Sequence, residues 1–168
     1  MKNKLNLLVL FAFVFTLSTS VAQTKVGGFV GYGSSRQQAG LGTIAEFPVS
    51  DKVSLSPSLL FYFPESTNTF RYNWLEFNTN VNYYFFQQGA INVYGIGGMN
   101  YFNQHVKNKD TGSSSSHGDV GVNLGVGSYF NVNKNFYPFA ELKFVLGDAD
   151  QMALFFGVKT NIRRRAHK

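Results

Sequence analysis

The sequence predicts an all-β fold, an eight-stranded antiparallel up-and-down β-barrel, and three observations lead to this prediction. Apolar and polar residues alternate along segments of strand length, and none of these segments keeps an apolar period of 3.6 residues. Charged residues make up only 14% of the chain and aromatic residues 17%, whereas a soluble domain carries about a quarter charged residues. Turn-forming residues separate the segments, and the connections alternate between short and long.

The first 22 residues have the features of a secretory signal peptide. Lys2 and Lys4 precede an apolar run of about thirteen residues, and Ser20-Val21-Ala22 supplies the small residues of a cleavage site. The run is short for a helix that crosses a bilayer, so an uncleaved anchor is the less favoured alternative. We therefore expect an exported mature chain that begins near Gln23 and forms one domain over residues 23–162.

The composition excludes several classes of protein. The chain has no cysteine, which excludes a disulfide framework, a thiolate metal site and lipid attachment through cysteine. Beyond the signal peptide, no apolar stretch approaches the length of a membrane helix. Only helices and closed barrels satisfy the backbone within lipid, so a membrane protein with this sequence is expected to be a barrel.

A short basic tail, residues 163–168, follows the predicted domain. It contains Arg163, Arg164 and Arg165 and contributes to a formal net charge of +6. Because the chain is exported and this charge is confined to a short tail, we do not expect it to bind nucleic acid. Two interpretations of the tail stay open: contact with anionic lipid headgroups at the inner leaflet, or an unstructured tail.

Eight segments have the character of strands, each bounded by turn-type residues. In chain order they are residues 24–33, 39–49, 52–63, 70–86, 90–104, 119–132, 135–147 and 151–162. Glycine is scattered through most of them, which disfavours helices and suits the strongly bent wall of a small barrel.

Alternation is clearest in the fourth, sixth and eighth segments. One face of these segments carries Leu75, Phe77, Val81, Tyr83 and Phe85; Val120, Val122, Leu124 and Val126; and Met152, Leu154, Phe156, Val158 and Ile162. The other face carries Glu76, Asn78, Asn80 and Asn82; Asp119, Gly121, Asn123, Gly125 and Gly127; and Gln151, Ala153, Lys159 and Asn161. A period of two places the two sets on opposite faces of a sheet.

Periodicity does not say which face is inside, because a soluble ligand-binding barrel and a membrane barrel differ only in that choice. The connections favour the membrane barrel. Those after the second, fourth and sixth segments are tight turns at residues 50–51, 87–89 and 133–134, whereas the others include 64–69 and the extended 105–118. We therefore expect residues 105–118 to face the outside of the cell and both ends of the mature chain to face the periplasm.

Aromatic residues gather toward both ends of the segments and predict two interfacial belts. The belt on the long-loop side is expected to contain Tyr62, Phe63, Phe70, Tyr72, Trp74, Tyr101 and Phe102. The belt on the short-turn side is expected to contain Phe47, Tyr83, Phe85, Phe86, Tyr129, Phe130, Phe136 and Tyr137.

Residues 92–98 (NVYGIGG), 122–127 (VNLGVG) and 137–143 (YPFAELK) carry a resemblance to known proteins. With them, the mature chain resembles the small eight-stranded outer-membrane barrels of the OmpA and OmpX type, and most of all the outer-membrane β-barrel domain proteins of Bacteroidetes-like genomes. Residues 154–162 resemble the family's C-terminal signal for the barrel-assembly machinery, which the resemblance implies as a partner during biogenesis. The sequence departs from that signal because Ile162 stands where an aromatic residue is usual and six residues follow it.

Charged residues are predicted to line the lumen. Every second residue of a strand points to the same face. The charged residues on the face expected to point inward are Lys25, Glu46, Glu76, Glu141, Lys143 and Lys159. Three acids and three bases on an otherwise polar wall are expected to pair, because an isolated charge in a narrow space is very costly. The hypothesis is an interior salt-bridge network that plugs the barrel; the alternative places some of these residues at the rims, solvated and unpaired.

The longest connection contains the residue types of a catalytic or metal site. His105, Asp110, Ser114 and His117 lie in it, with further serines and Asp119 nearby. A metal site or a serine–histidine hydrolase acting on lipid needs these groups held in hydrogen-bond reach. A Ser/Gly-rich run has the composition of a flexible linker, so a solvated surface loop without catalytic, cofactor or metal residues is the favoured interpretation.

The expected function is that of a non-enzymatic, monomeric integral outer-membrane protein that meets lipid along its wall and acts through its surface loops. An eight-stranded barrel fills with side chains and leaves no obvious pore. The alternatives are a soluble lipocalin-like barrel that carries a small apolar ligand, and a barrel enzyme that acts on lipid. The extracellular partner is not evident from the sequence.

Overall fold

A computed structural model describes residues 23–35, 37–147 and 150–162. Its strands are β1 (Lys25–Gly33), β2 (Gln38–Pro48), β3 (Val53–Tyr62), β4 (Glu65–Ser66), β5 (Phe70–Gln88), β6 (Ile91–Asn108), β7 (Ser114–Phe130), β8 (Tyr137–Gly147) and β9 (Gln151–Asn161). The predicted signal peptide and the basic tail with Arg163, Arg164 and Arg165 lie outside the described residues. In the part of the chain that is described, no helix is long and apolar enough to cross a membrane.

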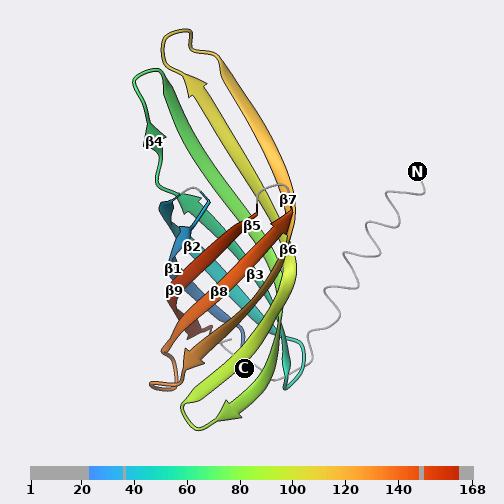
Figure 1. Cartoon of the computed structure of the whole chain (residues 1–168). Helices are drawn as coiled ribbons and strands as arrows, with labels where there is room; N and C mark the ends of the chain where they lie inside the picture. Colours follow the sequence, from blue (N-terminus) through green and yellow to red (C-terminus); the bar gives the residue numbers. More distant parts are fainter. Residues whose placement is uncertain (1–22, 36, 148–149, 163–168) are drawn as a thin grey trace, which may run out of the picture.

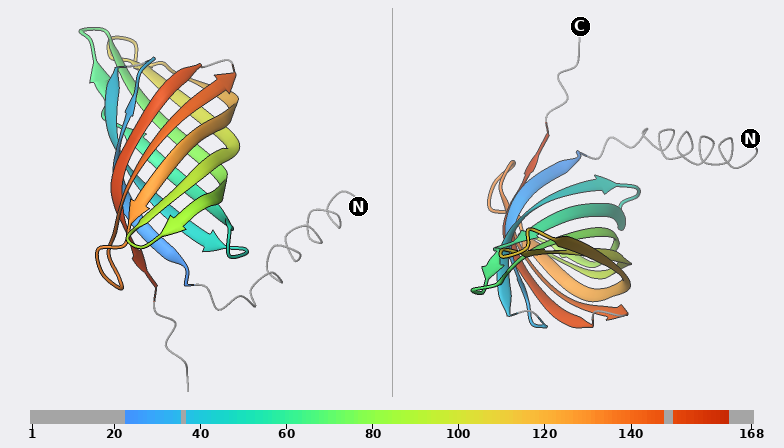
Figure 2. Two further views of the ribbon diagram at one scale, coloured as in Figure 1. Left: turned by 60° about the horizontal axis from the view of Figure 1, so that its bottom comes forward. Right: turned by 90° about the horizontal axis from the view of Figure 1, so that it is seen from above.

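The strands form one closed antiparallel barrel (Figures 1 and 2). Their order is β3-β2-β1-β9-β8-β7-β6-β5, and pairing of β3 with β5 closes the ring. The two-residue β4 stands outside the ring and pairs with the upper part of β5, with Glu65 opposite Tyr72. The predicted eight-stranded up-and-down barrel is confirmed, because each barrel strand pairs with its neighbours along the chain and the first pairs with the last.

Three strands are much longer than the others. β5, β6 and β7 have 19, 18 and 17 residues, whereas the remaining barrel strands have 9 to 11. Residues 70–74 of β5, 104–108 of β6 and 114–118 of β7 therefore continue as a three-stranded sheet beyond the rim, seen at the top of Figure 1. We call this sheet, together with β4, the extension. The end of the barrel that bears it is the loop end, and the opposite end, where β1 begins and β9 finishes, is the terminal end.

The prediction of a long loop at residues 105–118 is wrong. His105 lies opposite Ser116 and Lys107 opposite Ser114, so only residues 109–113 connect β6 to β7. The turn is itself ordered, since the Asn108 side chain accepts hydrogen bonds from the backbone N–H groups of Asp110 and Thr111. The serine-rich composition predicted a linker, but continuous pairing with β6, itself paired to β5, places Ser114, Ser115 and Ser116 in a strand. Strand formation depends more on neighbouring strands than on intrinsic propensity.

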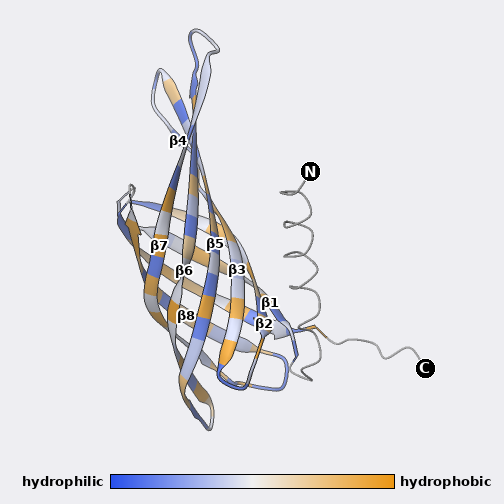
Figure 3. Ribbon diagram, turned by 90° about the vertical axis from the view of Figure 1, so that its right-hand side faces the viewer, coloured by the Kyte–Doolittle hydropathy of each residue, from blue (hydrophilic) through white to orange (hydrophobic). Residues whose placement is uncertain are grey.

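The apolar face of the barrel points outward. Along β5, Val81 is 47% exposed, while its neighbours Asn80 and Asn82 are 2% and 1% exposed. On β7, Leu124 is 51% exposed and Asn123 is fully buried. Figure 3 shows the same alternation of apolar and polar residues along these strands. An apolar exterior around a partly polar interior is the arrangement of a membrane barrel and the reverse of a soluble ligand carrier.

Candidate functional site

An ion-pair cluster lies inside the barrel toward the terminal end. Lys25 on β1 and Lys159 on β9 each place their Nζ atom 2.9 Å from a different oxygen of Glu46 on β2. Lys159 Nζ also lies 3.7 Å from Oε1 of Glu141 on β8. These four residues come from four adjacent strands, and only Lys25 has appreciable exposure. We call them the lower ionic cluster.

Two tyrosines complete the hydrogen bonding of the carboxylates. The Tyr84 hydroxyl donates to Glu46 at 2.7 Å, and the Tyr94 hydroxyl donates to Glu141 at 2.8 Å. The Tyr94 ring fits because residue 127 is glycine: a Cβ there would lie 2.5 Å from the ring. The sequence analysis did not predict the two tyrosine donors. Tyr84 lies an even number of residues after Glu76 in the same segment, so the alternation could have placed its side chain on the inward face.

Aromatic rings also surround the two lysines of this cluster. Lys25 Nζ lies 4.6 Å from the ring centroid of Tyr129, and Lys159 Nζ lies 4.5 Å from that of Phe139. A desolvated cation over an aromatic face gains electrostatic stabilisation from the ring. The lysines are therefore held by both carboxylates and rings, which accounts for a charged group as deeply buried as Lys159.

Glu76 lies in a separate polar group nearer the loop end. Its carboxylate accepts hydrogen bonds from the Tyr62 hydroxyl at 2.5 Å, from Asn78 Nδ2 at 2.9 Å and from Gln151 Nε2 at 3.2 Å. Among the residues that the structure describes, no basic side chain forms an ion pair with it. Glu76 is therefore held by neutral donors, not by the predicted salt bridges.

An asparagine ladder continues from this group. Asn78 Oδ1 accepts from Asn100 Nδ2 at 2.9 Å and from Asn123 Nδ2 at 2.8 Å. Asn123 Nδ2 also lies 2.7 Å from Asn80 Oδ1. These amides belong to β5, β6 and β7, so they tie together, inside the barrel, the three strands that carry the extension.

Lys143 is fully buried between the two acidic groups. Its Nζ atom has no hydrogen-bond partner within the described structure and lies 3.7 Å from the centroid of the Phe155 ring. Glu76 and Glu141 both attract it electrostatically. Of the six charged residues predicted for the lumen, all point inward; four form one connected cluster, and Glu76 and Lys143 do not join it by an ion pair.

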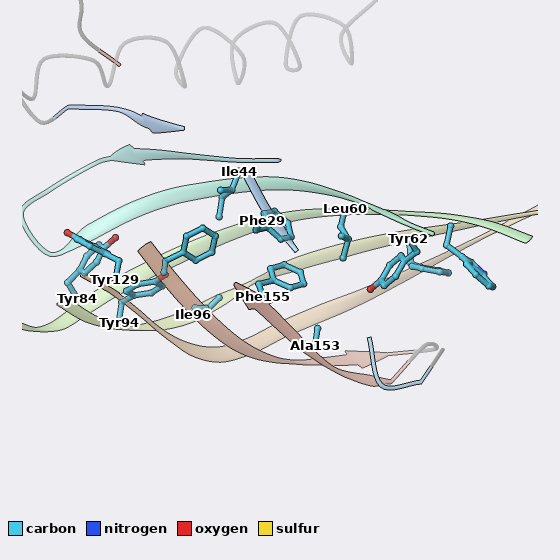
Figure 4. Packing of buried hydrophobic residues seen from close by; sticks show 13 residues of the cluster. Phe29, Ile44, Leu60, Tyr62, Tyr84, Tyr94, Ile96, Tyr129, Ala153 and Phe155 are labelled. Carbon is cyan, nitrogen blue, oxygen red and sulfur yellow. The ribbon is translucent and has the colours of Figure 1, made fainter. Parts of the chain in front are cut away.

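The expectation of an otherwise polar wall is wrong, because apolar residues fill much of the interior (Figure 4). Phe29 stacks on Phe155 with ring centroids 4.5 Å apart and meets Phe139 edge-on at 6.3 Å. Four aromatics assigned to the interfacial belts are instead buried on the inward side of their strands: Tyr62, Trp74, Phe102 and Tyr129. The alternation along the strands could have predicted this burial. Trp74, for example, lies two residues before Glu76, so both side chains point to the same face.

The other expected belt residues are in large part exposed. Exposed aromatics toward the loop end are Phe63, Phe70 and Tyr101, and toward the terminal end Phe47, Tyr83, Phe85, Phe86, Phe130 and Phe136. Tyr72 and Tyr137 are partly buried against the interior aromatics. The barrel is thus filled along its middle, and a pocket of about 510 Å³ opens at its terminal end beside Lys25, Glu46 and Tyr84.

The extension separates the residue types that could have formed a catalytic site. His105 Nδ1 lies 2.9 Å from Ser116 Oγ on the outward face, whereas His117 pairs with Asp119 at 3.0 Å on the inward face. Asp110 stands in the connecting turn, and Ser114 lies opposite Lys107. No serine, histidine and carboxylate converge here. Within the described residues, no group of three or more histidine or acidic side chains is placed to hold a metal ion.

A family profile matches most of the sequence. The profile of the "Outer membrane protein beta-barrel domain" matches residues 8–154. No curated protein sequence matches the chain.

Several solved structures have the same fold at low sequence identity. The N-terminal β-barrel domain of Pseudomonas aeruginosa OprF is 19% identical, with a TM-score of 0.67 over 83% of this chain and 97% of that one. Neisserial surface protein A is 14% identical, with a TM-score of 0.66 over 83% of this chain and 96% of that one. Ail, the attachment invasion locus protein of Yersinia pestis, is 13% identical, with a TM-score of 0.62 over 83% and 95% of the two chains.

Proposed function

Because the chain belongs to the outer membrane protein β-barrel domain family, we propose that this outer-membrane barrel acts without catalysis, by presenting its extension to partners outside the cell. The barrel wall meets outer-membrane lipid, and the barrel-assembly machinery inserts the chain after a signal peptide is removed. The proposed unit is a monomer.

The orientation follows from the two ends of the barrel. At the terminal end, residues 49–52, 89–90 and 131–136 connect β2 to β3, β5 to β6 and β7 to β8, whereas the loop end bears the extension. Outer-membrane barrels keep short turns in the periplasm and longer features outside. The extension would therefore stand outside the cell, and both ends of the mature chain would face the periplasm.

The observation that carries the proposal is a filled interior combined with a long, ordered extension. Aromatic residues and the lower ionic cluster occupy the middle of the lumen, and the pocket beside that cluster opens at the terminal end, which supports binding of an outside partner at the outer surfaces. In addition, β8 pairs with β7 only as far as Gly121, and no described strand pairs with residues 114–120 on that side. An unpaired strand edge can accept a strand from another chain.

A lipid-modifying enzyme is the weaker candidate. Such an enzyme needs a serine, a histidine and an acid held together, and the extension distributes these groups over opposite faces. The likeness to Ail supports the fold and does not by itself extend attachment to this protein.

Labelling of intact cells tests the orientation on which the proposal depends. A Ser114→Cys variant should react with a membrane-impermeant maleimide on intact cells, and an Asn133→Cys variant at the terminal end should react only after the cells are opened. Since the chain has no cysteine of its own, each variant carries a single reactive site. If intact cells were labelled at Asn133→Cys and not at Ser114→Cys, the terminal end would face the outside of the cell, which would contradict the proposed orientation.

Shortening the extension tests the function itself. Replacing residues 104–118 with a tight turn should leave a barrel that still migrates faster in gels when unheated, while adherence and aggregation of the cells decrease. Unchanged adherence and aggregation would contradict a role of the extension in contacts outside the cell. Membrane lipids that are altered in a strain with the native chain but not in one with a His105→Ala variant would contradict a non-enzymatic role.

A further inference from the structure

We propose that the outward face of the extension binds the phosphate groups of anionic lipid headgroups, through the side chains of Arg71 and Lys107. The inference goes beyond the proposed function and rests on it only in that the extension stands outside the bilayer. We call the surface formed by Arg71, Lys107, His105 and the adjoining serines the basic face.

The residues of the basic face lie in two rows across three strands. Arg71 on β5 is opposite Lys107 on β6, which is opposite Ser114 on β7. The next row toward the barrel is Asn73, His105 and Ser116 in the same order. Directly opposed residues of an antiparallel pair point to the same side, so Arg71 and Lys107 present their charges together.

These two charges lack compensation within the described residues. Like charges directly opposite each other destabilise a sheet, and neither Arg71 nor Lys107 forms an ion pair with a described residue. Two nearby acids are engaged elsewhere, since Glu65 accepts a hydrogen bond from Gln38 and Asp119 pairs with His117 on the inward face. Asp110, in the turn between β6 and β7, forms no ion pair with a described residue. An uncompensated cationic pair is an arrangement that an external anion would stabilise.

The basic face continues the lipid-facing surface of the barrel. Below it, on the same side of the same strands, Phe77, Tyr101 and Val120 form an exposed apolar row. A Cβ on Gly118 would lie 2.7 Å from the Tyr101 hydroxyl, so that hydroxyl points from the apolar row toward the extension. The polar tip of an interfacial tyrosine points toward the headgroups.

The spacing along β5 places the basic pair at headgroup height. Outward apolar residues run from Phe85 to Leu75, and these ten steps span roughly 25 Å of height at about 3.3 Å per residue and a strand tilt of about 40°. That height matches the apolar band of an outer-membrane barrel, about 25 Å. Arg71 is four residues further, roughly 10 Å above the band by the same geometry. Its side chain therefore reaches the region of lipid phosphates, which favours a membrane anion over a soluble one.

A fluorophore on the basic face provides the test, with the full-length protein reconstituted in vesicles. Ser114→Cys carries the label beside Lys107, and acrylamide quenching measures its exposure in vesicles of phosphatidylcholine alone or with phosphatidylglycerol. Each basic residue near an anionic surface contributes about a fivefold preference, so the pair should favour the bound state roughly thirtyfold. Quenching should therefore fall when phosphatidylglycerol is present and recover at high salt, where exposed charges are screened.

Two controls separate binding at this face from general effects. A label on Ser115→Cys, which lies on the inward side of the same strand, should show no dependence on phosphatidylglycerol. The Arg71→Gln/Lys107→Gln variant should lose the dependence at position 114, while Lys134→Gln, at the terminal end, should keep it. Retained gel mobility differences with and without heating show that each variant is folded.

Three outcomes would overturn the proposal. The first is equal quenching at position 114 in the two kinds of vesicle, and the second is retention of the effect in Arg71→Gln/Lys107→Gln. The third is protection of position 114 by inorganic tripolyphosphate in neutral vesicles as strong as that by phosphatidylglycerol, which would assign the face to a soluble polyanion. None of these results bears on whether intact cells expose the extension, so failure here is distinct from failure of the proposed function.

Discussion

The buried charges of the lower ionic cluster are each held by several partners at once. Glu46 accepts from Lys25, Lys159 and Tyr84, and Lys159 contacts two carboxylates. A buried ion pair is weak evidence for stability, but loss of one member leaves an uncompensated charge in a space that excludes water. The consequence is that single substitutions in the lower ionic cluster should be more damaging than paired ones.

Lys159→Met should therefore destabilise the protein by about 3–5 kcal/mol, because Glu141 and one oxygen of Glu46 lose their cation. Adding Glu141→Gln should restore part of that loss, since the neutral amide introduced at position 141 still accepts from Tyr94 and the Lys25–Glu46 pair balances its own charge. Urea unfolding in lipid vesicles, followed through the buried Trp74, measures both. A double variant no more stable than Lys159→Met would contradict the pairing.

The inward direction of these residues could be predicted from the sequence, but their partners could not. The alternation of side chains along each strand was enough to assign Glu46 and Lys159 to the lumen. Which residues meet depends on the register of the strands and on how the barrel closes, and neither is encoded locally. The same limit applies to Tyr84 and Tyr94, whose hydroxyls join the cluster from strands on the other side of the lumen.

The number and order of the strands, and which of their residues point inward, were predictable because period-two alternation is a strong local signal. Strand ends were not, and the error was largest where β6 and β7 run on into the extension. The sequence of residues 113–116 is four serines, whose composition is typical of linkers. Residues 114–116 form a strand because they hydrogen-bond to β6, and amino-acid composition alone does not predict such pairing.

The alternation makes a second prediction, for the face of β7 that meets lipid. Leu124→Arg should cost roughly 2–4 kcal/mol, because it places a charge near the bilayer midplane. Ser116→Arg, on the same face of the same strand but in the extension, should cost almost nothing. Unfolding in vesicles of defined lipid compares the two variants. Similar losses at both positions would argue against a bilayer around the lower part of β7.

The whole molecule combines a filled lumen with a long extension, and its properties depend on that combination. The asparagine ladder joins β5, β6 and β7 inside the barrel, and the same three strands form the extension outside it. A rigid, filled barrel is suited to hold an extended sheet at a fixed position on the membrane. The family and the fold were predictable at this scale, whereas the aromatic filling of the lumen was not foreseen, because the aromatics were assigned to the interfaces.

A closed lumen is the property on which the proposed action at the surfaces, and not as a pore, depends most. Planar-bilayer recording of the purified, folded protein tests this most directly. The aromatic core and the lower ionic cluster occlude the barrel, so the bilayer should show no stable channels, and Lys159→Met should be the variant most prone to transient openings. Stable, large-conductance channels from the native sequence would show that the lumen is open and would contradict the account.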